Sequence, residues 1–180
     1  MPFSQMFVWV EGPDDQRFVE TILLPAMQEQ YDFVEIVPYA GMTKDKAIKW
    51  LESIRAMENT EYVFLADRDR SPCVSQKKAD LTRKIKSLQA NRISVVVEEI
   101  EGWYLAGLTA LGRASLEIPE IANTDNVNKE AFDLHRAEEF DSRVDWMIEM
   151  LRFYSLEEGT ARNSSLRYFT EKFLPGAAQY

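Results

Sequence analysis

Patterns typical of strands and of helices alternate from the N-terminus to about residue 100 of this 180-residue chain. Short runs rich in Val, Ile, Phe and Tyr read as strands, and the segments between them repeat apolar residues with the period of a helix. The predicted strands are 7–10, 33–39, 61–66 and 92–99. Four strand–helix units in succession imply a parallel sheet with right-handed crossovers. The predicted fold is therefore α/β, with a four-stranded parallel sheet flanked by helices.

The segments between these strands carry signals for helix starts. Pro13 suits the first turn of a helix expected over about 13–30, and two aspartates follow it where the helix dipole favours negative charge. Thr43 is expected to cap a second helix and Ser75 a third. Three helices would then flank the sheet and make its crossover connections.

Beyond about residue 100 the strand patterns stop and only helical patterns remain. Helices are expected at 101–111, 128–139, 141–155 and 164–174. Single cores cluster at roughly 100–150 residues, so a chain of this length fits one core with an added part. We therefore expect an α/β core over 1–111 and a helical extension over 112–180 that packs on the core.

Cysteine content and hydropathy limit the kinds of protein this chain can be. Cys73 is the single cysteine, which excludes a disulfide framework and a thiolate zinc site within one chain. No apolar run approaches the roughly 20 residues that cross a bilayer, and the first residues lack the basic start and cleavage site of a secretion signal. A cytoplasmic protein without membrane contact is therefore expected.

The net charge is −9, from 21 Lys and Arg against 30 Asp and Glu. Affinity for a nucleic-acid backbone comes largely from Lys and Arg, which displace counterions, so a chain this acidic is repelled at long range. Residues 61–98 are locally basic, with 8 bases against 5 acids. The bases at 77–86 point in several directions around a helix and form no single stripe. Any contact with nucleic acid must therefore be local.

Acidic residues follow three of the four predicted strands. They are Glu11 and Asp15 after the first strand, Asp67 and Asp69 after the third, and Glu99 and Glu101 after the fourth. The second strand ends in Pro38-Tyr39-Ala40-Gly41, without an acid. The carboxyl ends of parallel strands form the ligand-binding edge of a sheet. With strand order 2-1-3-4, the three acid-bearing strands are neighbours and six carboxylates gather at one edge.

Carboxylates crowded in this way repel one another unless a cation neutralises them. Oxygen ligands without His or Cys suit a hard ion such as Mg²⁺ or Mn²⁺. The sequence therefore predicts a divalent metal site formed by these six residues.

Three motifs, taken together and in this order, resemble a Toprim domain. They are Val10-Glu11-Gly12-Pro13-Asp14-Asp15, Leu65-Ala66-Asp67-Arg68-Asp69 and Glu99-Ile100-Glu101-Gly102-Trp103-Tyr104-Leu105-Ala106. In particular the chain is similar to the Toprim branch of overcoming-lysogenization-defect (OLD) nucleases and their small stand-alone relatives, over about residues 5–110. Each motif alone is common by chance, but each of the three lies at a predicted strand end. The resemblance implies the Rossmann-like Toprim sheet with order 2-1-3-4.

The resemblance also implies a role for the acids of the first two motifs. Glu11 matches the acid after the first strand, which binds metal or takes part in proton transfer. Asp67 and Asp69 match the metal-binding Asp-x-Asp. Asp15 lies where OLD-type members have a second acid.

In the third motif, Glu101 aligns best with the family's late acid, and Glu99 would share a second ion. Two metal ions about 3.5–4 Å apart can hold the attacking and leaving oxygens of a phosphodiester during in-line displacement. The resemblance therefore implies a Mg²⁺-dependent nuclease acting on DNA or RNA.

The chain departs from OLD-type nucleases in two respects. An ATPase domain is not present in these 180 residues, so regulation by nucleotide would need a separate polypeptide. The family also places a basic residue after the last acidic motif, where it stabilises charge on the phosphoryl group. Arg162 and Arg167 are both candidates for that role. The predicted catalytic set is Glu11, Asp67, Asp69, Glu101 and Arg162.

Two other functions are compatible with the same residues. One is a non-catalytic metal-binding Toprim module that binds a partner or regulates it, since an acidic surface offers little grip on nucleic acid. The other is a receiver-like phosphoacceptor, which also has paired acids after its first strand and an aspartate after its third. A receiver needs a lysine after a fifth strand, and helical patterns fill that region here.

Structural roles are alternatives for several of these residues. Glu11 would then open a turn, and Asp15 would be a helix-start acid. Asp67 and Asp69 would form an Asx-type turn. The aromatic and leucine side chains at 103–105 are expected in a helix core rather than as a platform for stacking bases.

Overall fold

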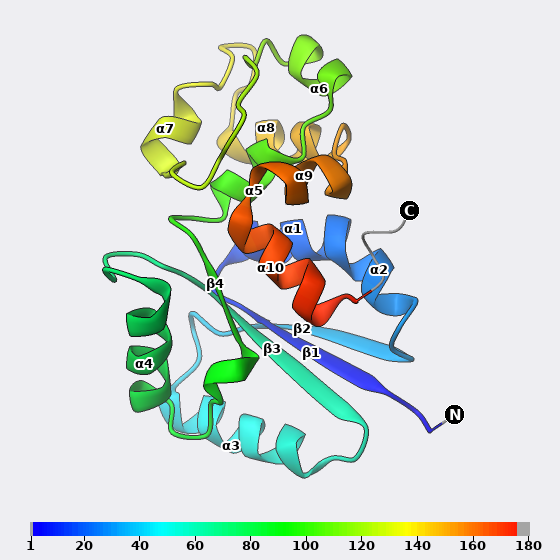
Figure 1. Ribbon diagram of the computed structural model, residues 1–180, viewed down its shortest axis with the longest axis vertical. Helices are drawn as coiled ribbons and strands as arrows, with labels where there is room; N and C mark the ends of the chain where they lie inside the picture. Colours follow the sequence, from blue (N-terminus) through cyan, green and yellow to red (C-terminus); the bar gives the residue numbers. More distant parts are fainter. Residues whose placement is uncertain (1, 176–180) are drawn as a thin grey trace. The chain divides into compact units, whose positions relative to one another are not determined.

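The computed structural model describes residues 2–175, and these contain one four-stranded sheet (Figure 1). The strands are β1 (Gln5–Val10), β2 (Phe33–Pro38), β3 (Thr60–Asp67) and β4 (Ile93–Val96). β1 pairs in parallel with both β2 and β3, and the strand order is β2-β1-β3-β4. The predicted α/β class, the parallel sheet and the order 2-1-3-4 are confirmed.

Side chains of the central strands are buried on both faces of the sheet. Phe7 and Trp9 of β1 and Phe64 of β3 belong to one buried cluster. Met6 and Val8 point to the opposite face, because successive side chains of a strand alternate, and both have no exposed surface. Strands that are buried on both faces are typical of parallel sheets covered by helices on each side.

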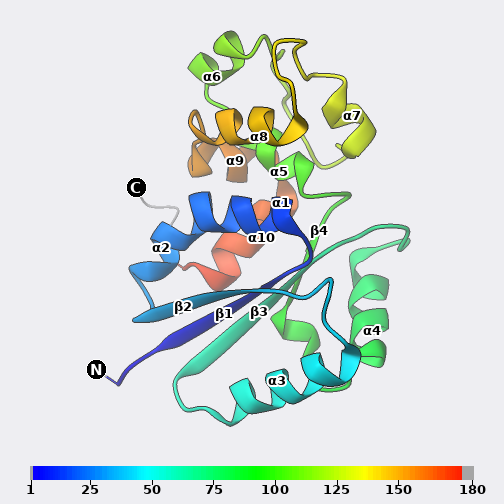
Figure 2. The same ribbon diagram turned by 180° about the vertical axis from the view of Figure 1, so that it is seen from behind.

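Helices cover both faces of this sheet. Figures 1 and 2 show α1 (Pro13–Phe18) and α2 (Leu24–Gln28) on one face, and α3 (Lys44–Ala56) and α4 (Val74–Lys84) on the other. Thr43 caps α3 as predicted, because its hydroxyl accepts a hydrogen bond from the backbone N–H of Lys46.

The helix predicted over 13–30 is not a single α-helix. A π-helical segment, η1 (Val19–Leu23), separates α1 from α2. Pro25 lies in the first turn of α2 and has no backbone N–H, so the usual bond to the carbonyl four residues before it is not formed. The backbone N–H of Leu24 instead bonds the carbonyl of Val19, five residues back, which is the π-helical pattern.

The start of α4 also differs from the prediction. Cys73 occupies the N-cap position in an extended conformation, with φ −157° and ψ 166°, and its side chain makes no capping hydrogen bond. Ser75, the predicted cap, lies inside the first turn of the helix. The cysteine is exposed and free.

β4 is shorter than the strand predicted over 92–99. Arg92, the first residue of the predicted strand, belongs instead to a 3₁₀ turn, η2 (Ala90–Arg92). At its other end, the backbone N–H of Val97 donates to the hydroxyl of Ser165 at 3.2 Å. Glu98 then has a positive φ of 57°, which ends the extended conformation.

The chain divides into two compact units, Met1–Val95 and Val96–Tyr180, whereas the sequence predicted the division after residue 111. The difference arises from α5 (Glu101–Ala106), which is buried along its whole length. The indole N–H of Trp103 donates to Ser165 at 2.8 Å, and the carbonyl of Trp103 accepts from the hydroxyl of Tyr154, also at 2.8 Å. These bonds make α5 part of the second unit's core.

The second unit is helical. Besides α5 it contains α6 (Ala110–Ser115), α7 (Lys129–Asp133), α8 (Arg143–Leu151), α9 (Leu156–Arg162) and α10 (Ser164–Phe173). The aromatic side chains of α5 are buried, as predicted, and the ring of Trp103 packs edge to face against Phe169 of α10. Within the described part of the chain, no helix combines the length and hydropathy needed to cross a bilayer.

Two of the predicted helices in this unit are interrupted. The helix predicted over 101–111 breaks after Gly107, where a Cβ would lie 2.2 Å from the ring of Tyr154. The backbone N–H of Thr109 bonds the carbonyl of Phe153 instead of continuing the helix. The helix predicted over 141–155 ends at Leu151.

Polar caps explain the remaining differences in this unit. Ser155 caps the new helix α9, because its hydroxyl accepts from the backbone N–H of Glu158 at 3.3 Å. Asn128 likewise caps α7 by accepting from the N–H of Ala131, but that helix ends at Asp133 rather than at the predicted residue 139. α10 agrees closely with the helix predicted over 164–174.

Candidate functional site

The carboxyl ends of β2, β1 and β3 lie side by side in the first unit, because the strands are parallel and β1 lies between β2 and β3 in the sheet. Glu11 directly follows β1, and Asp67 is the last residue of β3. Asp15 belongs to the first turn of α1. Tyr39 follows β2, the strand whose end lacks an acid. These four side chains form what we call the acid–tyrosine site.

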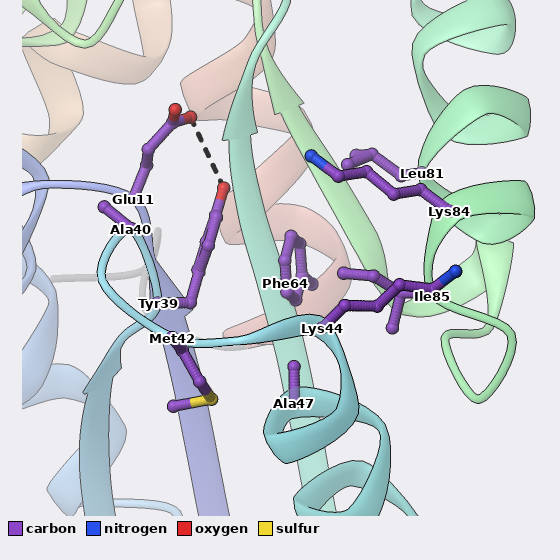
Figure 3. Close-up of a pocket in the computed structure, with 10 residues that line it drawn as sticks. All are labelled: Glu11, Tyr39, Ala40, Met42, Lys44, Ala47, Phe64, Leu81, Lys84 and Ile85. Atoms are coloured by element: carbon purple, nitrogen blue, oxygen red, sulfur yellow. Dashed lines mark hydrogen bonds between the residues drawn. The ribbon is translucent and has the colours of Figure 1, made fainter.

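The hydroxyl of Tyr39 connects two of these strands. It lies 3.0 Å from the carbonyl oxygen of Leu65 in β3 and 3.4 Å from a carboxylate oxygen of Glu11 (Figure 3). A hydroxyl has one proton to donate, and the shorter distance shows that the carbonyl is the closer acceptor. The ring also stacks on Phe64, with centroids 4.3 Å apart. Tyr39 is therefore held in one orientation beside Glu11.

The pKa of the Tyr39 hydroxyl responds to burial and to several nearby carboxylates. Burial is the largest cause that raises the pKa of the Tyr39 hydroxyl above its ordinary value. Three negative charges raise the pKa further, and they are those of Glu11, Asp15 and Asp67. The hydroxyl therefore stays protonated at neutral pH. Three of the six predicted ligands thus act on a single point at this edge of the sheet.

Asp15 is the most buried acid of this group, with 5% of its surface exposed. Its carboxylate accepts a hydrogen bond from the backbone N–H of Gly12 at 3.1 Å. This bond ties the turn after β1 to the start of α1, which is the helix-start role considered for Asp15. The same bond holds its negative charge near Tyr39.

Asp69 has a different environment from Asp67. Its backbone adopts a positive φ of 51°, a conformation that Asp tolerates better than most residues. Its exposed carboxylate forms an ion pair with Lys77 of α4. Asp69 is therefore oriented toward α4, and its role as a metal ligand stays a prediction.

The chemistry of the donors fits a hard divalent cation, since Glu11, Asp15 and Asp67 offer only oxygen atoms. Among residues 2–175, however, no group of three or more His, Cys, Asp or Glu side chains is arranged so that it could hold a metal ion. Binding would therefore require the carboxylates to turn toward a common point. The metal site of six acids remains a prediction.

In the second unit, Glu101 lies in a buried cluster of charges. Only 1% of its side chain is exposed, and it forms ion pairs with Arg143 and, at 3.9 Å, with Lys129. Burial raises the pKa of Glu101, and the two cations partly offset that effect. Arg143 also pairs with Asp133 and lies over the ring of Phe132. The contacts of Glu101 are thus those of a structural ion pair.

Glu99 and Arg162 also have definite contacts within the second unit. Glu99 accepts a hydrogen bond from the backbone N–H of Lys129 at the start of α7. The guanidinium of Arg162 donates to the carbonyls of Ala106 and Leu108, at 3.1 and 2.9 Å, and pairs with Glu158 at 2.6 Å. Arg162 thereby joins α9 to the end of α5. The other candidate base, Arg167, is exposed on α10.

A cavity of about 230 Å³ adjoins the acid–tyrosine site in the first unit (Figure 3). Its walls come from the ends of β1, β2 and β3 and from α3 and α4. The lining residues are Glu11, Tyr39, Ala40, Met42, Lys44, Ala47, Phe64, Leu81, Lys84 and Ile85. Glu11 and Tyr39 therefore belong both to the cavity and to the acid–tyrosine site.

Sequence reasoning missed Tyr39 and Lys44, and it included Lys84 only as one of eight bases in the locally basic stretch 61–98. The search at the strand ends considered only acids, so the end of the second strand was passed over. The strand order 2-1-3-4 was itself a usable signal, because it places the end of strand two beside Glu11 at the same edge. Lys44 and Lys84 carried no comparable signal, since each is one of several lysines on its helix.

We compared the chain with protein-family models, with curated proteins and with solved structures, and none of them matches it. The resemblance to Toprim domains therefore rests on the three motifs and on their places at strand ends.

Proposed function

We propose that the protein is a Mg²⁺-dependent nuclease of the Toprim type that cleaves phosphodiester bonds of DNA or RNA. The observation that supports this most directly is that Glu11, directly after β1, and Asp67, the last residue of β3, lie at the carboxyl ends of neighbouring strands, with the charges of both and of Asp15 raising the pKa of Tyr39. These acids come from separate segments of the chain, and the order of the strands brings them to one edge. A negative potential built in this way attracts a divalent cation.

Glu11 and Asp67 are the residues that would hold the ion, with Asp15 adding negative charge from the start of α1. A divalent ion bound there would supply a Lewis acid and a water molecule of lowered pKa. The hydroxyl of Tyr39 lies 3.4 Å from the carboxylate of Glu11 at this edge of the sheet. Asp69, Glu99 and Glu101 remain ligands proposed from the motifs alone.

The cellular setting is part of the proposal. The exposed free thiol of Cys73 is compatible with a reducing compartment, and we place the protein in the cytoplasm. The resemblance to OLD nucleases suggests that a separate ATPase polypeptide would act as its partner. Because the net charge is −9, such a partner would also help the protein to approach nucleic acid.

A second candidate function is a non-catalytic metal-binding module that binds or regulates a partner. The contacts of Arg162 favour it, because its guanidinium is engaged with two carbonyls and with Glu158. An arginine used in this way is not available to stabilise charge on a phosphoryl group without rearrangement. The acidic net charge favours the same candidate.

Cleavage assays distinguish the two candidates. Purified protein would be incubated with single- and double-stranded DNA and RNA in Mg²⁺ or Mn²⁺, beside the variants Glu11→Gln and Asp67→Asn. We expect each variant to lose about 100-fold or more in rate, as for other groups that stabilise charge in a reaction. Glu120→Gln, which removes an exposed acid from a loop of the second unit, is the matched control and should cleave normally.

The proposal is wrong if the wild type cleaves none of these substrates in either metal. Cleavage that persists in both Glu11→Gln and Asp67→Asn would point to a contaminating nuclease or to another site, and would also contradict it. Absence of cleavage together with saturable Mg²⁺ binding would favour the non-catalytic module.

A further inference from the structure

The cavity beside the acid–tyrosine site combines apolar walls with a positively charged rim (Figure 3). We propose that it is a subsite that holds one nucleotide of the substrate, with the base against the apolar walls and the phosphate near the lysines. This inference rests on the proposed function, because it names the part of the substrate that enters next to the acids. It assigns a role to Lys84 and Lys44, which none of the motifs includes.

The apolar part of the cavity suits a flat ring. Tyr39 and Phe64 form one wall as a stacked pair, with an angle of 25° between their ring planes. Side chains of Leu81 and Ile85 approach from the C-terminal end of α4. Every nucleobase has an apolar face that packs against such side chains whatever its sequence identity. Cavities for drug-sized ligands measure roughly 300–1,000 Å³, so a space of about 230 Å³ would take a ring-sized group such as the base and leave the phosphate at the rim.

The charged part of the cavity suits an anion. Two lysines, Lys44 and Lys84, line it against one carboxylate, that of Glu11. Figure 3 shows the ammonium group of Lys84 extending from α4 toward the side of the cavity where Tyr39 and Glu11 lie. The whole chain has a net charge of −9, which repels phosphate groups at long range. The two lysines of the cavity would attract a phosphate locally.

The cavity is also continuous with the acid–tyrosine site. Glu11 lines the cavity, and its carboxylate is bonded to Tyr39, which forms the adjoining wall. A nucleotide seated there would place its phosphate between the lysine side and the acids. The subsite would therefore favour substrates in which a nucleoside is attached to the reacting phosphate. Other phosphate esters would lack the base that fills the cavity.

Equilibrium binding of a nucleoside 5′-monophosphate in the absence of metal tests this inference. The titration would follow heat or intrinsic tryptophan fluorescence, with inorganic phosphate and the uncharged nucleoside as separate arms. We expect the monophosphate to bind saturably and more tightly than either fragment. The variant Lys84→Glu should weaken its binding by about tenfold, since exposed charge pairs are modest and reversal of the charge acts twice.

Two further variants make the test specific. Lys86→Glu makes the same charge reversal on an exposed lysine two residues away that does not line the cavity, and it should change affinity less than about twofold. Ala47→Phe fills the cavity from α3 and should abolish binding, provided that circular dichroism and melting show a folded protein. If Ala47→Phe does not fold, Lys84→Glu at the exposed rim still decides the question.

Three results would overturn the inference: no saturable binding of the monophosphate, equal weakening by Lys84→Glu and Lys86→Glu, or equal affinity for inorganic phosphate and the monophosphate. The cleavage assay is independent of this measurement. If the monophosphate binds as expected but no nucleic acid is cut, the subsite stands and the nuclease proposal fails. If nucleic acid is cut but the monophosphate does not bind, the reverse holds.

Discussion

Glu11 of the first unit and Glu101 of the second unit have different electrostatic environments. In the second unit, Glu101 lies against Arg143 and Lys129, which partly offset the cost of burying its charge. In the first unit, the negative charges of Glu11, Asp15 and Asp67 each raise the pKa of the Tyr39 hydroxyl, which stays neutral. An acid after a strand can therefore stabilise a unit through a cation of the same chain, or it can contribute to a potential that favours a cation from solution.

This difference separates a structural acid from a candidate ligand more clearly than motif position does. Glu101 and Glu11 both match acids of the Toprim motifs, yet only Glu101 is buried with cations of its own unit. If the interpretation is correct, substitutions in the second unit should change stability, whereas those in the first should change the response to metal.

The largest expected effect is on the ion pair of Glu101. Replacing Arg143→Met leaves a buried carboxylate without its nearest cation, and we expect the free energy of unfolding to fall by about 3 kcal/mol. Urea denaturation followed by circular dichroism measures this loss. Arg152→Met removes an arginine of the same helix region whose ion pair with Glu149 is largely exposed, so it should cost less than about 0.5 kcal/mol. Equal losses in the two variants would remove the basis of the comparison.

The second effect concerns the response to Mg²⁺. A ligand that binds only the folded state stabilises it by about 2.7 kcal/mol at 100 times its dissociation constant, and the melting temperature rises accordingly. Asp67→Asn should lose most of this rise, because it removes one of the charges that act on Tyr39.

Thermal melting with and without Mg²⁺ measures that response. Glu120→Gln, with the same loss of one exposed negative charge, should keep the full rise. A melting temperature of the wild type that does not change with Mg²⁺ would show that the first-unit acids do not hold the ion.

The third effect concerns Tyr39, the residue that links the strands of the site. Tyr39→Phe leaves the carbonyl of Leu65 without this donor and releases the carboxylate of Glu11. We expect a loss of about 1 kcal/mol in the free energy of unfolding, typical of one removed hydrogen bond. Tyr168→Phe, at an exposed position of α10, should change it by about 0.5 kcal/mol or less. If Tyr39→Phe leaves the free energy of unfolding unchanged, the hydroxyl of Tyr39 does not hold the site together.

The smallest effect is a pH dependence caused by Glu101. Burial raises the pKa of Glu101 in the folded protein above its value in the unfolded chain. The folded state therefore favours the protonated acid, and the protein loses stability as the pH rises through the folded-state pKa. Glu101→Gln resembles the protonated acid and lacks this loss. The stability of the variant minus that of the wild type should therefore increase as the pH rises above about 4, where glutamates begin to titrate. Parallel stability profiles of the two proteins over this range would contradict the sign of the shift.

Much of the fold could be predicted from the sequence because its signals are local. The β-rich runs and the helical periodicity located four strands, and Thr43 and the apolar face of α3 located a helix and its cap. Pro25 was a visible helix breaker inside the predicted first helix, so the π-helical segment before it had a sequence signal that was not used. Gly107 was likewise a visible helix-end signal, but its contact with the ring of Tyr154, which is distant in the sequence, could not be predicted.

For the candidate site, too, the sequence predicted local features but not contacts between distant segments. The acids at the strand ends could be named in advance, since each directly follows an apolar strand pattern. Tyr39 and Lys84 could not be ranked above other tyrosines and lysines, because their importance comes from what lies across the sheet from them. Sequence reasoning also treated Glu101 and Glu11 alike, and only the position of Arg143 separates them.

The sequence by itself determined the class of fold and the acids that follow its strands, because strand and helix periodicity act over short stretches of chain, whereas the strand order 2-1-3-4 was implied by the resemblance to Toprim domains. The tertiary structure decided that Glu101 is buried against Arg143, that Tyr39 lies beside Glu11, and that a cavity opens next to those two residues. These properties depend on distances between segments that are remote in the sequence, and electrostatic energies change steeply with such distances.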